Sequence, residues 1–176
     1  MDHLLITFLF GTILICPIFS AQEINDLKGD AMIKEITGLH HITSMASNAS
    51  VNNAFFTKTL GLRRVKKTVN FDAPEVYHLY YGDEIGTPGS VMTYFPFAKM
   101  SPGQRGAGEV SITEFAVPKD ALGFWKERLS ALGVSSLIES SFLGEKRLSF
   151  DGPDGDGFAL VESWNAPIRW SMINVN

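Results

Sequence analysis

The sequence predicts an α+β fold made of two βαβββ modules that pair their sheets into a cup-shaped half-barrel, with the helices outside. The chain contains an internal repeat, in which one unit begins at Gly38 and the other at Gly108. Each unit also places an alternating strand, an amphipathic helix and three strand-like runs in the same order. One such unit leaves a sheet face uncovered, so two are expected to join. The concave face that results is where a ligand or metal would lie.

Module one is expected over residues 36–99. It opens with the run GLHHIT, and its helix carries Phe55 and Phe56 and ends at Leu60-Gly61, because glycine just past the last apolar residue stops a helix. Turn-forming residues separate the three strands that follow. These strands are expected at residues 63–69, 76–82 and 90–95.

Module two is expected over residues 108–163 and repeats this pattern. Its helix carries Phe124 and Trp125 and ends at Leu132-Gly133. Its three later strands are expected at residues 135–140, 146–150 and 158–162.

The two helices are expected to pack on the sheets through their aromatic pairs, so Phe55, Phe56, Phe124 and Trp125 are all predicted to be buried in the core. Ser50 and Asp120 are expected to cap the helices or to lie in their first turns.

The segment 1–31 is expected to be either signal-like or untranslated upstream sequence. Residues 4–21 resemble the apolar part of a secretory signal, but no Lys or Arg precedes them and the bulky Phe19 lies near the cleavage position. Met32 opens a run that reads as a natural start, which favours a cytoplasmic protein. The alternative is export through a signal peptide over residues 1–21.

The modules together make one expected domain over residues 32–165, followed by a tail or truncated inter-domain linker at 166–176. No stable membrane span is expected, because the N-terminal apolar run is short for a bilayer and contains Pro17.

Composition excludes several classes of site. The net charge is −4, and the one dense basic cluster, Arg63, Arg64, Lys66 and Lys67, lies in a strand-like run, so no nucleic-acid partner is expected. The single cysteine, Cys16, lies in the N-terminal apolar run. Disulfides, thiolate nucleophiles and cysteine metal sites are therefore excluded from both modules.

Three stretches carry a resemblance to a known family: GLHHIT, FFTKTLGLRRVKKTVNFDAPEVYHLYYGD and PDGDGFALVE. Over about residues 32–163 the chain resembles the vicinal oxygen chelate superfamily, also called the glyoxalase/bleomycin-resistance/dioxygenase fold. More narrowly, it resembles the N-terminal domain of ring-cleaving dioxygenases that open hydroquinone-type rings.

The resemblance implies a mononuclear non-haem Fe(II) or Mn(II) ion held by two histidines and one glutamate in an enzyme of four modules. His41, the second histidine of the motif, matches a metal ligand. His40 and Thr43 match positions that act on the substrate and on oxygen intermediates. The other two ligands belong to a part of such enzymes that this chain does not contain, so the metal site is expected to be incomplete.

Counting candidates by the repeat gives the same expectation. Two imidazoles and one carboxylate leave positions open for substrate and O₂. Aligning Gly38 with Gly108 places Ser111 at the position of His41, so module two lacks a second histidine. Glu162, in the last strand, is the predicted second ligand.

His78 and Tyr80 are two residues apart on a strand and therefore share a face, which predicts that both line a substrate pocket. The competing interpretation of His78 is a structural histidine bonded to its neighbours.

The favoured function is an extradiol-type ring-cleaving dioxygenase, of which this chain forms the N-terminal half. Its partners would be a small aromatic substrate, O₂, and either a second domain or a second copy of the chain. The alternative is a non-catalytic module of the same fold that sequesters a small aromatic ligand. A metal-dependent isomerase or thiol transferase, and an inactive truncated product, are the remaining alternatives.

Overall fold

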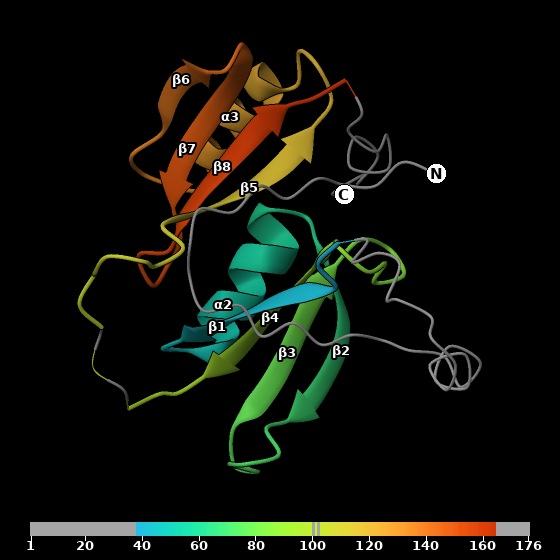
Figure 1. Ribbon diagram of the computed structural model, residues 1–176, viewed down its shortest axis with the longest axis vertical. Helices are drawn as coiled ribbons and strands as arrows, with labels where there is room; N and C mark the ends of the chain where they lie inside the picture. Colours follow the sequence, from blue (N-terminus) through green and yellow to red (C-terminus); the bar gives the residue numbers. More distant parts are fainter. Residues whose placement is uncertain (1–37, 100, 102, 165–176) are drawn as a thin grey trace, which may run out of the picture.

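The computed structural model describes residues 38–99, 101 and 103–164, so the predicted segments 1–31 and 166–176 lie outside the described residues. The first module begins with a strand and a helix whose last turns are π-helical (Figure 1). Its elements are β1 (His41–Ala46), α2 (Ala49–Ala54), η1 (Phe55–Thr59), β2 (Arg63–Val69), β3 (Tyr77–Gly82) and β4 (Val91–Pro96).

The second module repeats this order. Its elements are β5 (Ile112–Val117), α3 (Leu122–Ala131), β6 (Ile138–Phe142), β7 (Glu145–Asp151) and β8 (Gly157–Glu162). The strand predicted at 135–140 begins later, at Ile138, because Ser136 adopts a positive φ of 61° that interrupts extended backbone. The α+β class and the two βαβββ modules are otherwise confirmed.

Each module forms a four-stranded sheet with the same topology. The strand orders are β1-β4-β3-β2 and β5-β8-β7-β6, and in each sheet the first and last strands of the module run parallel while the other neighbours are antiparallel. The described strands form two separate sheets that do not close into a barrel. In Figure 1 the first module (blue to green) lies below the second (yellow to red), with α2 between their sheets.

The helix ends follow the glycine signals but not the predicted caps. Gly61 and Gly133 have φ values of 73° and 78°, in the left-handed region that glycine adopts without a Cβ clash. Asn48, and not Ser50, caps α2 by accepting from the amides of Ser50 and Val51, and Ser50 lies in the first turn, which was the other expectation for it. Asp120 lies in the turn before α3 at a positive φ of 62°.

One aromatic core joins the two modules. Phe56 is 1% exposed, stacks on Tyr81 at 4.8 Å between ring centroids, and meets Phe158 of the second sheet edge-on at 5.9 Å. Phe55 also contacts Phe158, at 5.5 Å. Arg128 of α3 adds a polar link, since it donates to the carbonyls of Thr59 and Lys58 at the end of η1. The modules therefore pack as one body around the helix of the first.

The prediction that Phe124 is buried is wrong. This side chain is 61% exposed, while Trp125 and Leu129 turn the apolar stripe of α3 toward its sheet. No described helix combines the length and the apolar character that crossing a membrane requires.

The two phenylalanines provide a matched test of the shared core. Phe56→Ala is expected to lower the free energy of unfolding by about 3–5 kcal/mol, because it opens a cavity where both sheets meet. Phe124→Ala removes the same atoms from an exposed site and is expected to cost much less. Urea denaturation of the full chain measures both. Equal losses in the two variants would contradict the core described here.

Candidate functional site

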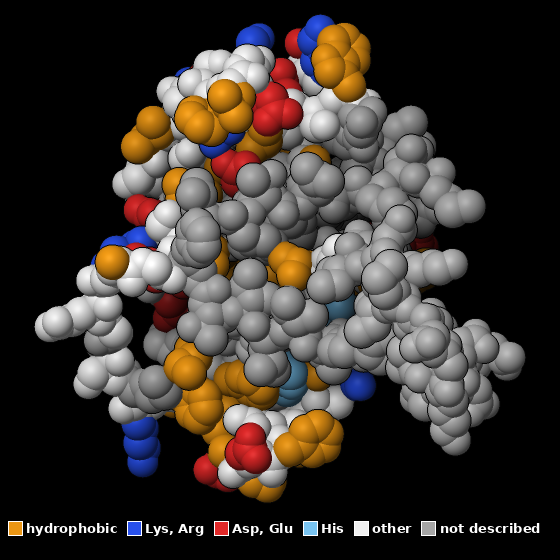
Figure 2. All heavy atoms as spheres, viewed as in Figure 1, with side chains coloured by type: hydrophobic (Ala, Val, Ile, Leu, Met, Phe, Trp, Pro, Cys, Tyr) orange, Lys and Arg blue, Asp and Glu red, His pale blue; other side chains and the backbone are white. Residues whose placement is uncertain are grey.

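The open face of the first sheet, on the side away from α2 and η1, carries a group of polar side chains. Leu79, Tyr81 and Met92 alternate toward the aromatic core, so their neighbours on β3 and β4 face the other way. We call this the polar face and define it by His41, Thr43, His78, Tyr80 and Thr93. Figure 2 shows histidine side chains reaching the surface among hydrophobic side chains in the lower half of the molecule, where the first module lies.

Four of these side chains form a continuous hydrogen-bonded chain across three strands. The Tyr80 hydroxyl lies 2.8 Å from His78 Nδ1, and His78 Nε2 lies 2.9 Å from Thr93 Oγ1. Thr93 Oγ1 in turn lies 2.8 Å from Thr43 Oγ1. The last contact exists because β1 and β4 are parallel with Thr43 directly paired to Thr93.

The four hydrogen-bonded side chains differ in how far they are buried. Thr93 is 0% exposed, His78 and Tyr80 are half-buried, and Thr43 is exposed. Phe95 lies against the His78 ring at 4.0 Å, and the Lys66 ammonium lies 5.4 Å from the Tyr80 ring centroid. The hydrogen-bonded chain therefore runs across one face of the first sheet, with Thr93 as its most buried member and Thr43 as its most exposed one.

His78 stays neutral over the physiological range. Burial lowers its pKa to about 4, and the charges of His41 and Lys66 act in the same direction. A neutral imidazole has one N–H donor and one acceptor nitrogen, so both ring nitrogens can be satisfied by Tyr80 and Thr93.

His40 and His41 bind each other, although adjacent strand residues were expected to diverge. Their Nδ1 atoms are 2.9 Å apart and their rings meet edge-on at 5.1 Å. The two rings can meet because His40 precedes the first residue of β1, so strand alternation does not force its side chain to the opposite face. Burial, followed by the charge of His40, lowers the pKa of His41. One Nδ1 must donate to the other, and when His41 is the donor its Nε2 carries a free lone pair.

Glu162 does not share the polar face with His41. It follows Phe158 and Leu160 on the helix-facing side of β8, and its Oε1 accepts from the amide of Leu122, at the start of α3, at 3.4 Å. Its predicted role as a metal ligand stays a prediction.

The described residues do not make up the donor set of a facial triad. No group of three or more His, Cys, Asp or Glu side chains within residues 38–99, 101 and 103–164 is arranged to hold a metal ion. Both ring nitrogens of His78 already have partners. His41 is the one predicted ligand whose position on the polar face suits the role, so a metal bound there requires further donors from elsewhere.

The structure also corrects the alignment of the two modules. His41 pairs with the first residue of β4, whereas in the second sheet Ile112 pairs with the first residue of β8. His41 is therefore equivalent to Ile112 and not to Ser111. The first strands of the two modules align with a shift one residue larger than the alignment of Gly38 with Gly108 gives. A one-residue shift exchanges the two faces of a strand. The conclusion that module two lacks a matching histidine still holds.

Sequence reasoning missed Thr93 and the matching group in the second sheet. There, Glu114 occupies the position of Thr43 and Ala159 that of Thr93, and the Arg147 guanidinium pairs with Glu114 Oε1 at 2.5 Å. The parallel pairing of first and last strands would have identified these residues, but a sequence alone does not state the register.

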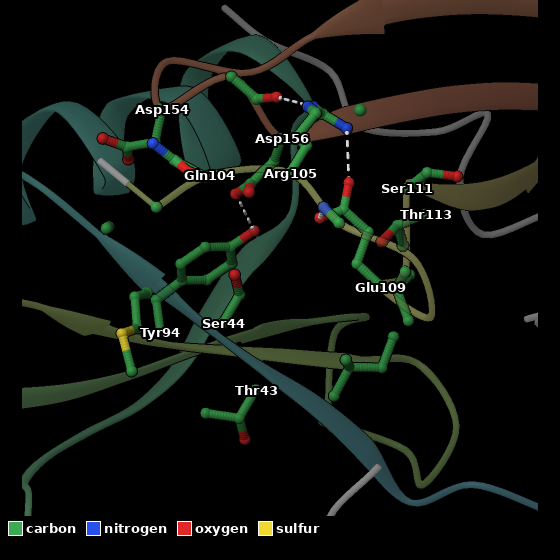
Figure 3. Close-up of a pocket in the computed structure, with 18 of the residues that line it drawn as sticks. Thr43, Ser44, Tyr94, Gln104, Arg105, Glu109, Ser111, Thr113, Asp154 and Asp156 are labelled. Carbon is green, nitrogen blue, oxygen red and sulfur yellow. Dashed lines mark hydrogen bonds and ion pairs between the residues drawn. The ribbon is translucent and has the colours of Figure 1, made fainter. Parts of the chain in front are cut away.

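A cleft of about 840 Å³ lies between the modules, on the other side of β1 (Figure 3). Thr43 and Ser44 leave β1 on opposite sides, so Ser44 and Tyr94 face this cleft and the Thr43 side chain points away from them. The Tyr94 hydroxyl donates to Asp156 Oδ2 at 3.1 Å, and Asp154 accepts from the amide of Ser47 at 3.0 Å. Burial raises the pKa of both Tyr94 and Asp156.

The charged side chains that line the cleft between the modules already have partners within the protein. Arg105 donates to the carbonyl of Gly155 at 2.6 Å and pairs with Glu109 at 3.4 Å. We therefore interpret the cleft as the junction of the modules, and the polar face as the candidate site.

Two curated relatives are similar to this chain over about three quarters of its length. MhqE of Bacillus subtilis, named as a ring-cleaving dioxygenase, is 47% identical over 125 residues, which is 71% of this chain and 41% of MhqE. Chlorohydroquinone/hydroquinone 1,2-dioxygenase of Sphingobium indicum is 39% identical over 145 residues, which covers 76% of this chain and 45% of that enzyme. The chain thus spans less than half the length of these relatives. No protein-family model matches it.

Solved structures agree with this comparison. A dioxygenase structure from Bacillus subtilis matches with a TM-score of 0.69 at 43% identity, covering 72% of this chain and 40% of that one. The fold that the resemblance implies and the similarity to ring-cleaving dioxygenases are confirmed. The vicinal oxygen chelate fold is also shared with the fosfomycin resistance protein FosX of Listeria monocytogenes, solved as a mutant with Mn(II). That match has a TM-score of 0.54 at 20% identity and covers 72% of this chain and 92% of FosX.

The lowered pKa of His78 predicts a pH-dependent stability. The unfolded histidine takes up a proton below its ordinary pKa of 6.5, whereas the folded one does so only near 4. The His78 contribution is therefore complete above pH 6.5 and is lost as the pH falls toward 4. At most about 1.4 kcal/mol per pH unit is available, and solvent screening at this half-buried position reduces it.

We expect the free energy of unfolding of the wild type to fall more steeply than that of His78→Gln between about pH 6.5 and pH 4. Urea denaturation of both proteins at several pH values measures the two slopes, and the variant controls for the carboxylates that titrate in the same range. Parallel slopes would show that His78 is not held neutral by the fold.

Proposed function

We propose that this chain is part of an extradiol-type ring-cleaving dioxygenase that acts on hydroquinone- or catechol-type aromatics at a mononuclear Fe(II) or Mn(II) site. The observation that supports this most directly is the polar face itself. It places His41 and Thr43 on one side of β1 beside His78 and Tyr80, in a chain that is 39–47% identical to proteins named as ring-cleaving dioxygenases.

His41 would supply one ligand, and His40 would orient it. When His41 Nδ1–H donates to His40 Nδ1, the ring orientation is held and Nε2 is left for a metal. In catalysis His40 would further contact substrate or oxygen intermediates, as the motif implies.

At least one further ligand would come from outside the described residues, because His41 and Glu162 are the two candidates within them. A second domain of the same fold, or a second copy of this chain, could supply it. The share of the relatives that this chain spans, 41% and 45%, favours the second domain. FosX, which shares the fold, is bound to Mn(II) in its solved structure, so the fold is compatible with such a metal.

The aromatic substrate would lie over the polar face. Hydroxyl and imidazole groups of Thr43, His78 and Tyr80 can hydrogen-bond phenolic oxygens, and Phe95 lies against the His78 ring to give an apolar border. These residues would orient the ring and hold protons at its oxygens.

The alternative is a module of the same fold that binds a small aromatic ligand without catalysis. The observation in its favour is that no three-ligand group is formed within the described residues. Tight binding of catechol by metal-free protein, without oxygen uptake after iron loading, would favour this alternative.

Metal content and oxygen uptake test the proposal together. After anaerobic loading with Fe(II), wild-type protein in which a second copy of the chain supplies the missing ligands is expected to retain iron and to consume O₂ when hydroquinone is added. His41→Ala is expected to bind iron at least about 100-fold more weakly, since even residues that only support a ligand change affinity by about 10- to 100-fold.

Glu162→Gln is the companion variant. Unchanged iron content would show that Glu162 only accepts a hydrogen bond from Leu122 at the start of α3. A loss of iron would show that Glu162 is a metal ligand. Retention of iron by His41→Ala equal to the wild type would exclude His41 as a ligand. A lack of uptake by protein that demonstrably holds iron would exclude dioxygenase activity for this chain alone.

A further inference from the structure

We propose that Thr93 is the central positioning residue of a proton relay that connects Tyr80 to Thr43 across β3, β4 and β1. The relay is a property of the described side chains, while its use in ring cleavage rests on the proposed function. The chain of contacts, 2.8, 2.9 and 2.8 Å, has hydrogen-bonding lengths at every step.

Only two hydrogen orders satisfy every contact and also give the buried Thr93 hydroxyl an acceptor for its hydrogen. Neutral His78 donates through one nitrogen and accepts through the other, and each hydroxyl donates once. In the first order Tyr80 donates to His78 Nδ1, His78 Nε2 donates to Thr93, and Thr93 donates to Thr43. The hydroxyl hydrogen of Thr43 is then free for a ligand.

In the second order every bond is reversed. Thr43 donates to Thr93, Thr93 donates to His78 Nε2, and His78 Nδ1 donates to Tyr80, whose hydroxyl hydrogen becomes free. A free hydroxyl hydrogen is thus available either at Thr43 or at Tyr80, and the state of one residue determines the state of the other.

Passage of one proton converts the first order into the second. A basic oxygen of a bound aromatic ligand takes the Thr43 proton, Thr43 takes that of Thr93, Thr93 takes that of His78 Nε2, and His78 Nδ1 takes that of Tyr80. One O–H bond forms on the ligand and one breaks on Tyr80, so charge and atoms balance. The Tyr80 phenolate, at a half-buried position, then takes a proton from a water molecule, which leaves as hydroxide, so the net result is transfer of one proton from water to the ligand oxygen.

Thr93 is the residue that couples the hydrogen position at Tyr80 to the hydrogen position at Thr43. It is 0% exposed, so water cannot replace a missing partner of its hydroxyl. An unpaired buried donor costs more than an unfilled acceptor lone pair, because the hydroxyl oxygen can still be satisfied by one bond. Thr93 must therefore donate to whichever neighbour, Thr43 or His78, is the acceptor.

The second module shows that packing alone does not demand this arrangement. The equivalent positions hold Glu114 and Ala159, and Glu114 pairs with Arg147. The same topology there carries an ion pair, with no hydroxyl at the position of Thr93.

The tautomer of His78 reports the hydrogen order, and the full metal-free chain labelled with ¹⁵N-histidine can be measured by long-range ¹H–¹⁵N correlation NMR. Thr43→Val removes the acceptor of Thr93 and is expected to shift His78 toward the Nδ1–H form by about fivefold, the equilibrium effect of one neutral hydrogen bond. Tyr80→Phe removes the acceptor of Nδ1–H and is expected to shift it the opposite way, toward Nε2–H.

The decisive step is a double-mutant cycle, because Thr43 makes no direct bond to His78. In a Thr93→Val background, Thr43→Val is expected to have no effect on the tautomer, whereas in a Thr93→Ser background the shift is expected to persist. Ser44→Ala, on the opposite side of β1, is the control and is expected to leave the ratio unchanged.

An unchanged tautomer ratio in Thr43→Val, or a shift of the same size with and without the Thr93 hydroxyl, would overturn the relay. If Thr93→Val fails to fold, the comparison of Thr43→Val with Thr43→Ser decides, since only the former removes the hydroxyl. The measurement needs neither metal nor turnover, so its failure would leave the dioxygenase proposal standing, and inactivity of the chain would leave the relay standing.

Discussion

The register between the parallel strands β1 and β4 is the constraint on which the polar face depends. It sets Thr43 opposite Thr93 and turns His41 to the same side. Because side chains alternate, a slip of β4 by one residue would turn Thr93 toward the aromatic core and expose Met92 and Tyr94 instead. The position of each polar group is thus tied to the burial of its neighbours, so the aromatic core and the candidate site stabilise the same register.

The shared core gives this face a rigid support. Phe55 and Phe56 of the first helix reach Phe158 of the second sheet, and Tyr94 reaches Asp156 across the junction. A hydrogen-bonded chain of short contacts requires such support, since displacements of a few tenths of an ångström would lengthen its links beyond useful distances. The arrangement therefore joins packing in the interior to chemistry on the outer face.

The repeat and its glycines were enough to predict the two modules and the ends of both helices. The pairing of His78 with Tyr80 also followed from their spacing on one strand. Thr93 could not be identified in this way, because its role depends on which residue of β1 lies beside it, and strand register is a tertiary property. The same limit explains the displaced equivalence of His41. Phe124 was predicted as core because aromatic residues favour burial, but the neighbouring Trp125 takes the inward position.

The most direct test of the claim that the polar face is the metal-binding face is the anomalous scattering of Mn(II) in crystals of the full chain. The account predicts an anomalous peak within coordination distance of His41 Nε2, on the Thr43 side of β1. A peak at Glu162 or beside Asp154 and Asp156, with none at His41, would contradict it.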